Sequence, residues 1–220
     1  MSKRIVWLVL FLLPLSVEAQ NWMFHVGGGL ASQTSDNCAV GAFKVGVSYE
    51  QELNGMWSFA PGLQFYAKGR RDKDQTIPIM GENGKQMVDD NGNLVFGLMG
   101  RSTSANYLQV PIMVNYYWRM APSRYVVLSA GPYVACGVLG KVKTKGDASK
   151  EGAEKLYYEG KTFEEPGTNR FATGVQAMVG YHFASGLIIG VEADFGLTHF
   201  DAIGRRNISG LINLSYRLNP

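Results

Sequence analysis

Histidine, serine and carboxylate side chains are the groups in this sequence with the chemistry to catalyse a reaction. His182 precedes Ser185 by three residues, and a histidine that takes a proton from a serine can drive hydrolysis through a covalent intermediate. Nothing nearby in the sequence supplies an acid to orient the ring or donors for an oxyanion. We therefore favour a rim histidine that is hydrogen-bonded to a neighbour, and we predict no catalytic residue.

Two carboxylates two residues apart, Glu192 and Asp194, share one face if their segment is a β-strand. They could act as an acid/base pair or bind a cation. We favour an ion-pair network with Arg217, because charges in a narrow interior must be paired. Lys44 and Glu50 lie on the equivalent polar face of their own segment. The predicted structural network is therefore Lys44, Glu50, Glu192, Asp194 and Arg217.

An acidic stretch from Asp89 to Asn93 has the Asp-x-Asn-x-Asn spacing of half a calcium loop. Leu94 stands where such a loop needs glycine. Asn91-Gly92 is also a strong signal for a type I′ hairpin turn. We favour a small hairpin, and we expect neither a metal nor a cofactor.

The segments that must position these residues alternate between polar and apolar side chains, which is the period of a β-strand. In the last of them, 207–218, polar residues occupy the odd positions and mostly apolar ones the even positions; Leu211 is the exception. Eight such segments are predicted: 22–31, 40–51, 56–68, 106–118, 124–140, 170–183, 186–198 and 207–218. Short connections alternate with the longer ones 32–39, 69–105, 141–169 and 199–206, as in membrane barrels with short inner turns and long outer loops.

Periodicity alone does not say which face points inwards. A soluble barrel that carries a small hydrophobic ligand has the same period with the apolar face inside. Here the apolar face holds more Trp and Phe than an eight-stranded lumen has room for, and aromatic residues such as Trp57 and Trp118 lie towards segment ends, as in an interfacial girdle. The sequence therefore predicts a closed, antiparallel, up-and-down transmembrane β-barrel of about eight strands, in contact with outer-membrane lipid.

The N-terminus has the order of an export signal: basic Lys3-Arg4, an apolar stretch, and Val17-Glu18-Ala19. We expect cleavage near Ala19, a signal peptide over 1–19 and a barrel domain over 20–220. The formal net charge of +3 gives no reason to expect nucleic acid binding. We expect Cys38 and Cys136 to be unpaired.

Pro61, Pro111 and Pro132 are unusual in a closed sheet, because proline cannot donate to a strand ladder. We interpret them as bulge or kink sites. Each also falls in a segment that resembles the Bacteroidetes outer-membrane β-barrel domain family, often called PorT-like. The three segments are Ala60-Pro61-Gly62-Leu63 with Lys68-Gly69 following, Tyr107-Leu108-Gln109-Val110-Pro111, and Gly131-Pro132-Tyr133.

The resemblance implies a cell-envelope protein of the outer membrane, with a role beside a protein-secretion apparatus. We expect a non-enzymatic structural or interaction protein that meets envelope or secretion proteins through loops 69–105 and 141–169. Two alternatives stay open: a soluble periplasmic carrier of a hydrophobic ligand, and a lipid-modifying outer-membrane enzyme.

Overall fold

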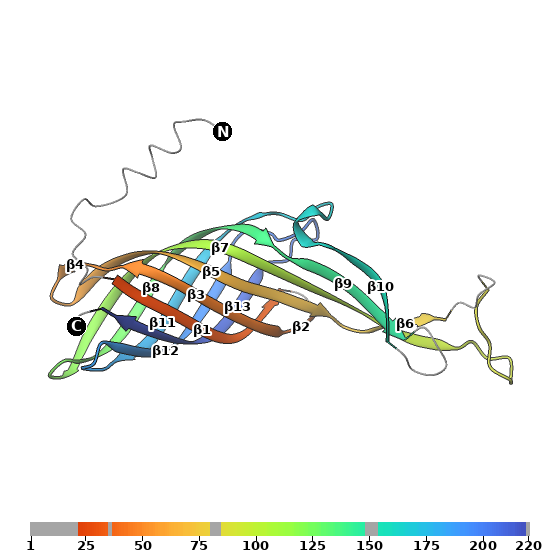
Figure 1. The fold of residues 1–220 in the computed structure, drawn as a ribbon, viewed down its shortest axis with the longest axis horizontal. Helices are drawn as coiled ribbons and strands as arrows, with labels where there is room; N and C mark the ends of the chain where they lie inside the picture. The colour runs from red at the N-terminus through yellow and green to blue at the C-terminus, as the bar shows by residue number, and fades with distance from the viewer. Residues whose placement is uncertain (1–21, 35–36, 80–84, 148–153, 219–220) are drawn as a thin grey trace, which may run out of the picture.

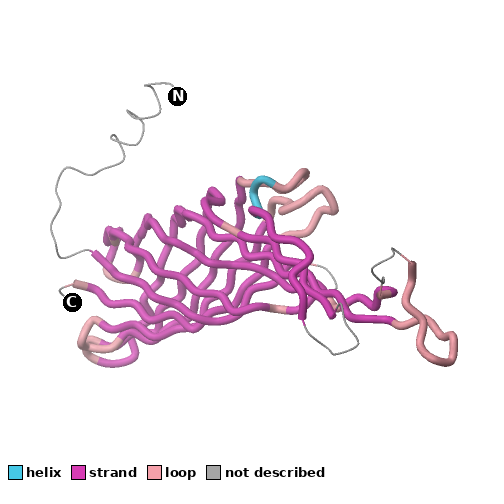
Figure 2. The backbone as a smooth tube through the Cα atoms, turned by 45° about the vertical axis from the view of Figure 1, so that its right-hand side comes forward, coloured by secondary structure: helices cyan, strands magenta, loops and turns pink. Residues whose placement is uncertain are grey.

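Eight long strands form a closed antiparallel ring in the computed structural model, which describes residues 22–34, 37–79, 85–147 and 154–218. Each strand pairs with the next along the chain, and β13 pairs with β1 to close the ring. Figures 1 and 2 show the resulting barrel. Its strands are β1 (Trp22–Gln33), β3 (Val40–Tyr49), β5 (Trp57–Asp72), β7 (Phe96–Ala121), β8 (Arg124–Leu139), β11 (Phe171–His182), β12 (Leu187–Gly196) and β13 (Asn207–Arg217). The predicted fold class is confirmed. The expected signal peptide lies outside the described residues.

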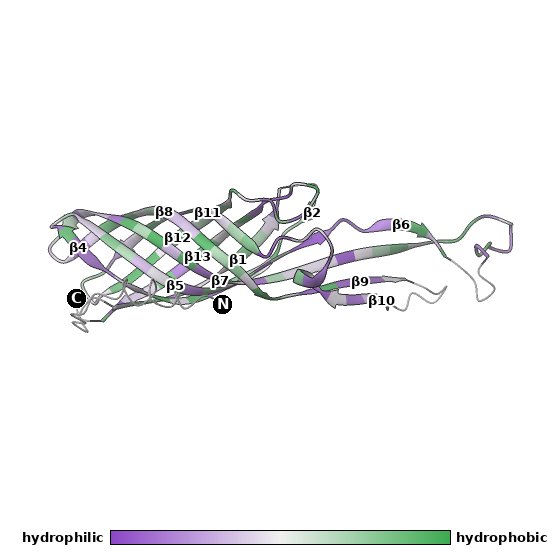
Figure 3. Ribbon diagram, turned by 90° about the horizontal axis from the view of Figure 1, so that it is seen from above, coloured by the Kyte–Doolittle hydropathy of each residue, from purple (hydrophilic) through white to green (hydrophobic). Residues whose placement is uncertain are grey.

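Burial alternates along the strands, with apolar side chains facing outwards. Trp57 and Ile112 are 43 % and 40 % exposed, and Val191 is 65 % exposed. The opposite face is polar and buried: Lys44, Gln109 and many others have almost no exposed surface. Figure 3 shows the alternation as bands of hydrophobic and hydrophilic residues along the barrel strands. Among the described residues no helix has the length and apolarity to cross a membrane.

Two of the short turns at the inner end of the barrel each contain a residue with a left-handed backbone conformation. Ser123 has a φ of 57° between β7 and β8, and Gly186 has a φ of 83° between β11 and β12. The third turn follows the short strand β4 (Gln51–Asn54), which pairs with β5. The predicted alternation of short and long connections is therefore present.

The strands do not stop where the sequence predicted loops 69–105 and 141–169. β7 has 26 residues, more than twice the ~9–11 that a tilted strand needs to cross a bilayer. Its outer part pairs with β6 (Gln75–Pro78) on one side and with β9 (Lys141–Asp147) on the other, and β9 pairs with β10 (Glu154–Lys161). These strands form an open sheet beyond the barrel, which we call the outer extension (Figure 1). The prediction of two long loops was wrong over these stretches.

None of the three prolines lies at a bulge or at a register shift. Pro61 lies opposite Ile112, Pro111 opposite Tyr133, and Pro132 opposite Val175. The β5–β7 ladder lacks two residue pairs after Pro61, and the β7–β8 ladder lacks two after Pro111. Each ladder then resumes in the same register. The register shifts between β7 and β8 lie elsewhere, at Asn106/Tyr107 and Arg119/Ala121. Omitting pairs, rather than inserting a residue, accommodates the missing N–H groups.

Residues 85–95 form the predicted small hairpin above the barrel, with Val88 bridged to Leu94. Its turn is not of type I′, which needs positive φ at both central residues, because only Gly92 has one (φ 80°). Asp89 stabilises the turn by accepting hydrogen bonds from the backbone N–H groups of Asn91 and Asn93, at 2.9 and 2.8 Å. The Asp89 carboxylate thus stabilises the hairpin turn by accepting backbone hydrogen bonds.

Candidate functional site

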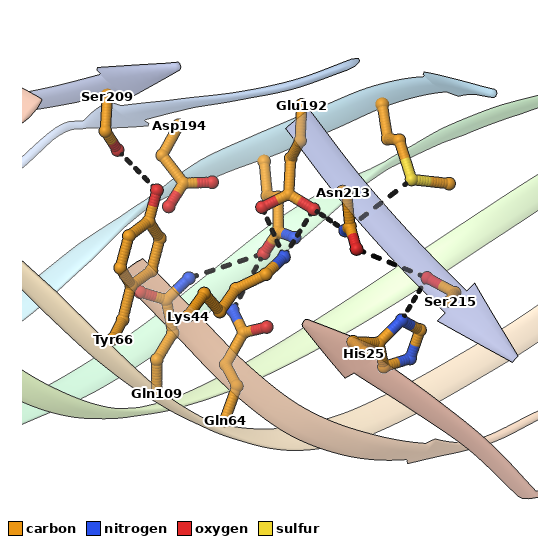
Figure 4. A network of polar contacts seen from close by, with 12 residues as sticks. His25, Lys44, Gln64, Tyr66, Gln109, Glu192, Asp194, Ser209, Asn213 and Ser215 are labelled. Atoms are coloured by element: carbon orange, nitrogen blue, oxygen red, sulfur yellow. Dashed lines mark hydrogen bonds and ion pairs between the residues drawn. The ribbon is translucent and has the colours of Figure 1, made fainter. Parts of the chain in front are cut away.

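An ion pair lies at the centre of the barrel. Lys44 on β3 binds Glu192 on β12, and their side chains are 1 % and 2 % exposed. Asn213 on β13 donates a hydrogen bond of 2.6 Å to the same carboxylate. Figure 4 shows the three side chains converging across the lumen from different strands. The buried carboxylate has both a cation and an amide donor, as a buried charge requires.

A second ion pair lies one step further towards the outer end. Lys68 on β5 donates to Asp194 at 3.0 Å and to Gln109 at 3.4 Å. Its ammonium also lies 4.0 Å from the centre of the Tyr66 ring, in a cation–π contact. Tyr66 is fully buried and its hydroxyl meets Ser209 Oγ at 2.8 Å. Lys68 and its partners therefore occupy this level of the lumen, although Asp194 Oδ1 has no partner among the described residues.

Glu50 is the centre of a third cluster at the inner rim. Its carboxylate binds Arg217 and accepts hydrogen bonds from Tyr117 at 2.6 Å and Asn115 at 3.0 Å. The hydroxyl of Ser58 donates to the same oxygen. Glu50 is 1 % exposed, so this set of donors replaces the water that it has lost.

The expected pairing of Arg217 with Glu192 and Asp194 was wrong. Glu192 lies opposite Leu211 on β13, six residues before Arg217, so Arg217 is at the inner rim and reaches Glu50 instead. All five predicted residues face the lumen, but they belong to three clusters, and each cluster contains a different basic residue. The sequence prediction left out Lys68, the cation of the second cluster. Its position on the polar face of β5 was the available signal.

Three glutamines lie in the middle of the barrel, and one of them, Gln109, contacts the second cluster through Lys68. The side-chain amides of Gln64 and Gln109 both donate to Gln176 Oε1, at 3.1 and 3.3 Å. A cavity of about 40 Å³ remains beside them. A single water needs roughly 10–15 Å³, so the cavity holds only a few waters. The interior is a packed polar plug.

Apolar residues close the outer end of this plug. Tyr107, Tyr133 and Phe200 pack together with Ala105, Ala135 and Ala172, and Phe163 covers them. The hydroxyl of Tyr107 accepts a hydrogen bond of 3.3 Å from Asn207. The lumen therefore does not continue into the outer loops.

His25 has the closest serine contacts of the described histidines. Its Nε2 lies 2.6 Å from Ser48 Oγ and its Nδ1 lies 2.7 Å from Ser215 Oγ. With a serine on each nitrogen, no carboxylate orients the ring as hydrolytic sites require. We assign His25 to the plug; sequence reasoning overlooked it, although its place in β1 puts it on the inner face.

His182, the candidate base, lies against two aromatic rings. Its ring centre is 6.1 Å from that of Tyr117 and 5.7 Å from that of Tyr125, in edge-on contacts. Neither ring nitrogen has a hydrogen-bond partner among the described residues. Ser185 is thus not bonded to it, and the expected hydrogen bond of a rim histidine to a neighbour is also missing. Cys38 and Cys136 are both free, as predicted.

Charged residues of the outer extension form ion pairs at the surface, with one another and with the segment that follows β10. Arg101 on β7 lies 2.7 Å from Glu165, and Lys141 on β9 lies 3.0 Å from Glu159 on β10. The hydroxyl of Tyr158 donates to Glu165 at 2.5 Å. This hydrogen bond lowers the pKa of Glu165 and raises the pKa of Tyr158. Among the described residues no group of His, Cys, Asp and Glu is placed to hold a metal ion.

Comparison with known proteins gives a family match over most of the chain. Residues 17–202 match the family model described as outer membrane protein beta-barrel domain. No curated protein matches the sequence. Among solved structures, the attachment invasion locus protein Ail of Yersinia pestis is 13 % identical, with a TM-score of 0.38 and coverage of 90 % of this chain and 99 % of that one.

Two further solved structures match this chain over nearly all of their own length. Neisserial surface protein A is 10 % identical, with a TM-score of 0.43 and coverage of 90 % of this chain and 97 % of that chain. The outer membrane enzyme PagL is 10 % identical, with a TM-score of 0.40 and coverage of 88 % and 99 %.

Proposed function

This chain belongs to the outer membrane protein beta-barrel domain family, and on that premise we propose that it is a non-enzymatic interaction protein of the outer membrane. In this proposal the plugged barrel is an anchor and the outer extension binds another envelope protein. The observation that carries it is β7, whose 26 residues run from the inner turn into the outer extension without a break. Such a strand holds a binding surface rigidly outside the membrane.

The outer extension has exposed apolar side chains of the kind that proteins use to bind one another. Phe96 and Leu98 on β7 are 54 % and 55 % exposed. Leu94 and its bridge partner Val88 are 45 % and 53 % exposed. Leu94, Phe96 and Leu98 are two residues apart, so they share one face. Polar Ser102 and Ser104 separate this face from the lipid-facing part of β7, which supports a protein rather than a lipid partner.

The PorT-like resemblance adds a narrower proposal, that the partner is a component of a protein-secretion or envelope-assembly apparatus. The proposal includes export through a signal peptide that is cleaved near Ala19. Buried, mutually paired charges in the lumen support an anchor rather than a pore or a carrier. The exposed apolar faces argue against the soluble carrier, which would have these faces inside.

A photo-crosslinking amino acid at Leu98 of the full chain, in intact cells, tests the interaction role. We expect a discrete protein adduct whose second component, identified by mass spectrometry, is an envelope or secretion protein. The matched control is the same substitution at Ile189, which is 42 % exposed on the barrel wall and should give only lipid adducts. No protein adduct at Leu98, or the same adducts at both positions, would contradict the proposal.

Lipid profiles test the enzyme alternative separately. Cells with the chain, without it, and with His182→Ala should have the same outer-membrane lipids if the protein is not an enzyme. A lipid species that appears only with the unmodified chain would overturn the non-enzymatic part of the proposal, and its persistence in His182→Ala would direct attention to His25.

A further inference from the structure

A cleft of about 230 Å³ lies at the outer mouth of the barrel, above the apolar residues that close the plug. This is far more than the roughly 10–15 Å³ that one water requires. One wall consists of residues 162–168 together with Arg101, Thr103 and Val142, and the other consists of residues 200–205. The two walls come near each other at Gly167 and Ala202, where a Cβ added to Gly167 would lie 3.2 Å from the Cβ of Ala202.

The charged side chains that line the cleft cancel one another. Arg101 lies 2.7 Å from Glu165 on one side, and Arg205 lies 2.5 Å from Asp201 on the other. Both signs are therefore present on both walls. Because each guanidinium group is already paired with a carboxylate, a charged ligand would bring an unpaired charge into the cleft, so the cleft favours a ligand without net charge.

Hydrogen-bonding capacity remains in these walls. The hydroxyl of Thr103, a residue that is 4 % exposed, and the Nε of Arg101 have no partner among the described residues. Each carboxylate oxygen of Glu165 accepts from one donor, Tyr158 or Arg101, and has a second lone-pair site, so Glu165 can accept further hydrogen bonds. The cleft can thus donate and accept at the same time.

Apolar side chains supply the rest of the lining. Val142 and Phe200 are 2 % and 4 % exposed and form part of the buried wall, and Pro166 and Ile203 lie nearer the surface. Because Phe200 also belongs to the apolar cluster that closes the plug, the cleft has a closed floor. A ligand can enter only from outside the cell.

We propose that this cleft binds one ring of a neutral saccharide. A sugar ring has apolar C–H faces and hydroxyl groups that each donate and accept a hydrogen bond. It therefore matches a small, electrically balanced cleft that has apolar walls and also offers hydrogen-bond donors and an acceptor. The site is separate from the apolar face of the outer extension and does not depend on the protein partner proposed above.

Saturation-transfer NMR on the purified full chain in detergent micelles tests this inference. The probes are the methyl glycosides of glucose, galactose and mannose, with glucuronate and glucosamine as charged counterparts. We expect transfer to at least one neutral glycoside, and we expect glucuronate and glucosamine to bind at least tenfold more weakly than that glycoside. No transfer to any neutral glycoside, or stronger transfer to a charged sugar, would overturn the proposal.

Two variants place the binding in the cleft. Ala202→Trp adds an indole at an exposed turn position where it would fill the cleft, and we expect at least a tenfold loss of the neutral glycoside. Ala184→Trp makes the same change at an exposed turn at the inner end and should leave binding unchanged. Both substitutions are at the surface, so both variants should fold. Equal binding by the two variants would exclude the cleft as the site.

Discussion

Lys44 and Glu192 form an ion pair across the lumen, although two strands, β13 and β1, separate β12 from β3 in the sheet. Backbone pairing cannot bring these side chains together, because neighbouring strands alone share a ladder. They meet only when the ring closes. The ion pair therefore depends on the closed barrel, and the barrel interior depends on the ion pair.

Lys44→Met should destabilise the barrel by about 3–5 kcal/mol, because it leaves the buried Glu192 carboxylate without its cation. Urea unfolding in micelles, followed by tryptophan fluorescence, measures the loss. The double variant Lys44→Met with Glu192→Gln should recover most of it, since the amide can still accept from Asn213. A single variant as stable as the unmodified chain would show that the pair is not needed.

Arg217→Ala should lower the free energy of unfolding by about 1.5–3 kcal/mol, the scale of hydrogen bonds to charged groups. Glu50 would keep Ser58, Asn115 and Tyr117 as donors, so the loss is smaller than for Lys44. Mobility on gels with and without boiling reports the weaker barrel. Glu52→Gln, at an exposed position 3.9 Å from Arg217, is the control and should behave like the unmodified chain.

The same Arg217→Ala variant should not conduct ions, because the plug above the inner rim stays intact. Planar-bilayer recordings of the unmodified chain and the variant should both lack a large steady current. A large steady current in either protein would disprove the plug.

Val191→Arg should destabilise the barrel by about 2–4 kcal/mol, the cost of a basic side chain on the lipid face near the bilayer midplane. Val191 lies near the middle of β12 and is 65 % exposed. Ile203→Arg, at an outer position that is 79 % exposed, is the control and should cost nothing. Folding into lipid vesicles measures both. Equal effects would contradict the outward orientation of the apolar face.

Acid should release the contact between Glu165 and the outer extension. The hydrogen bond from Tyr158 lowers the pKa of Glu165, so the state in which this contact is formed binds fewer protons than the state in which it is broken. Its contribution is fully present above the ordinary glutamate pKa of about 4.3 and is lost as the pH falls through the lowered pKa. Hydrogen exchange of residues 162–168, corrected for the intrinsic rate, should rise over this range. In Glu165→Gln the corrected exchange should not depend on pH.

Sequence reasoning predicted the barrel strands well because their signal is local. Alternation from Leu108 to Trp118 identifies the lipid-facing part of β7 without any knowledge of its neighbours. The outer part of the same strand carries a much shorter signal: the alternation stops after Phe96 and Leu98, and Gly97 and Gly100 have weak strand preferences. It is a strand because β6 and β9 pair with it, and those contacts are not encoded locally.

The candidate site was predictable as a set of residues but not as a set of contacts. Strand period places Glu192, Asp194 and Lys44 on the polar face, and the structure has them there. Which acid meets which base depends on the stagger of the strands around the ring. That stagger puts Arg217 beside Glu50, and no pattern within one strand contains this information.

The uninterrupted course of β7 from the inner turn to the outer extension has a mechanical consequence. A load applied at Phe96 passes along one backbone into the barrel wall, where it meets ladders with β5 and β8 on either side. These hydrogen bonds would be strained together, in shear, instead of being unzipped one after another at a hinge. We therefore expect the outer extension to transmit tension to the barrel wall without bending where it leaves the barrel.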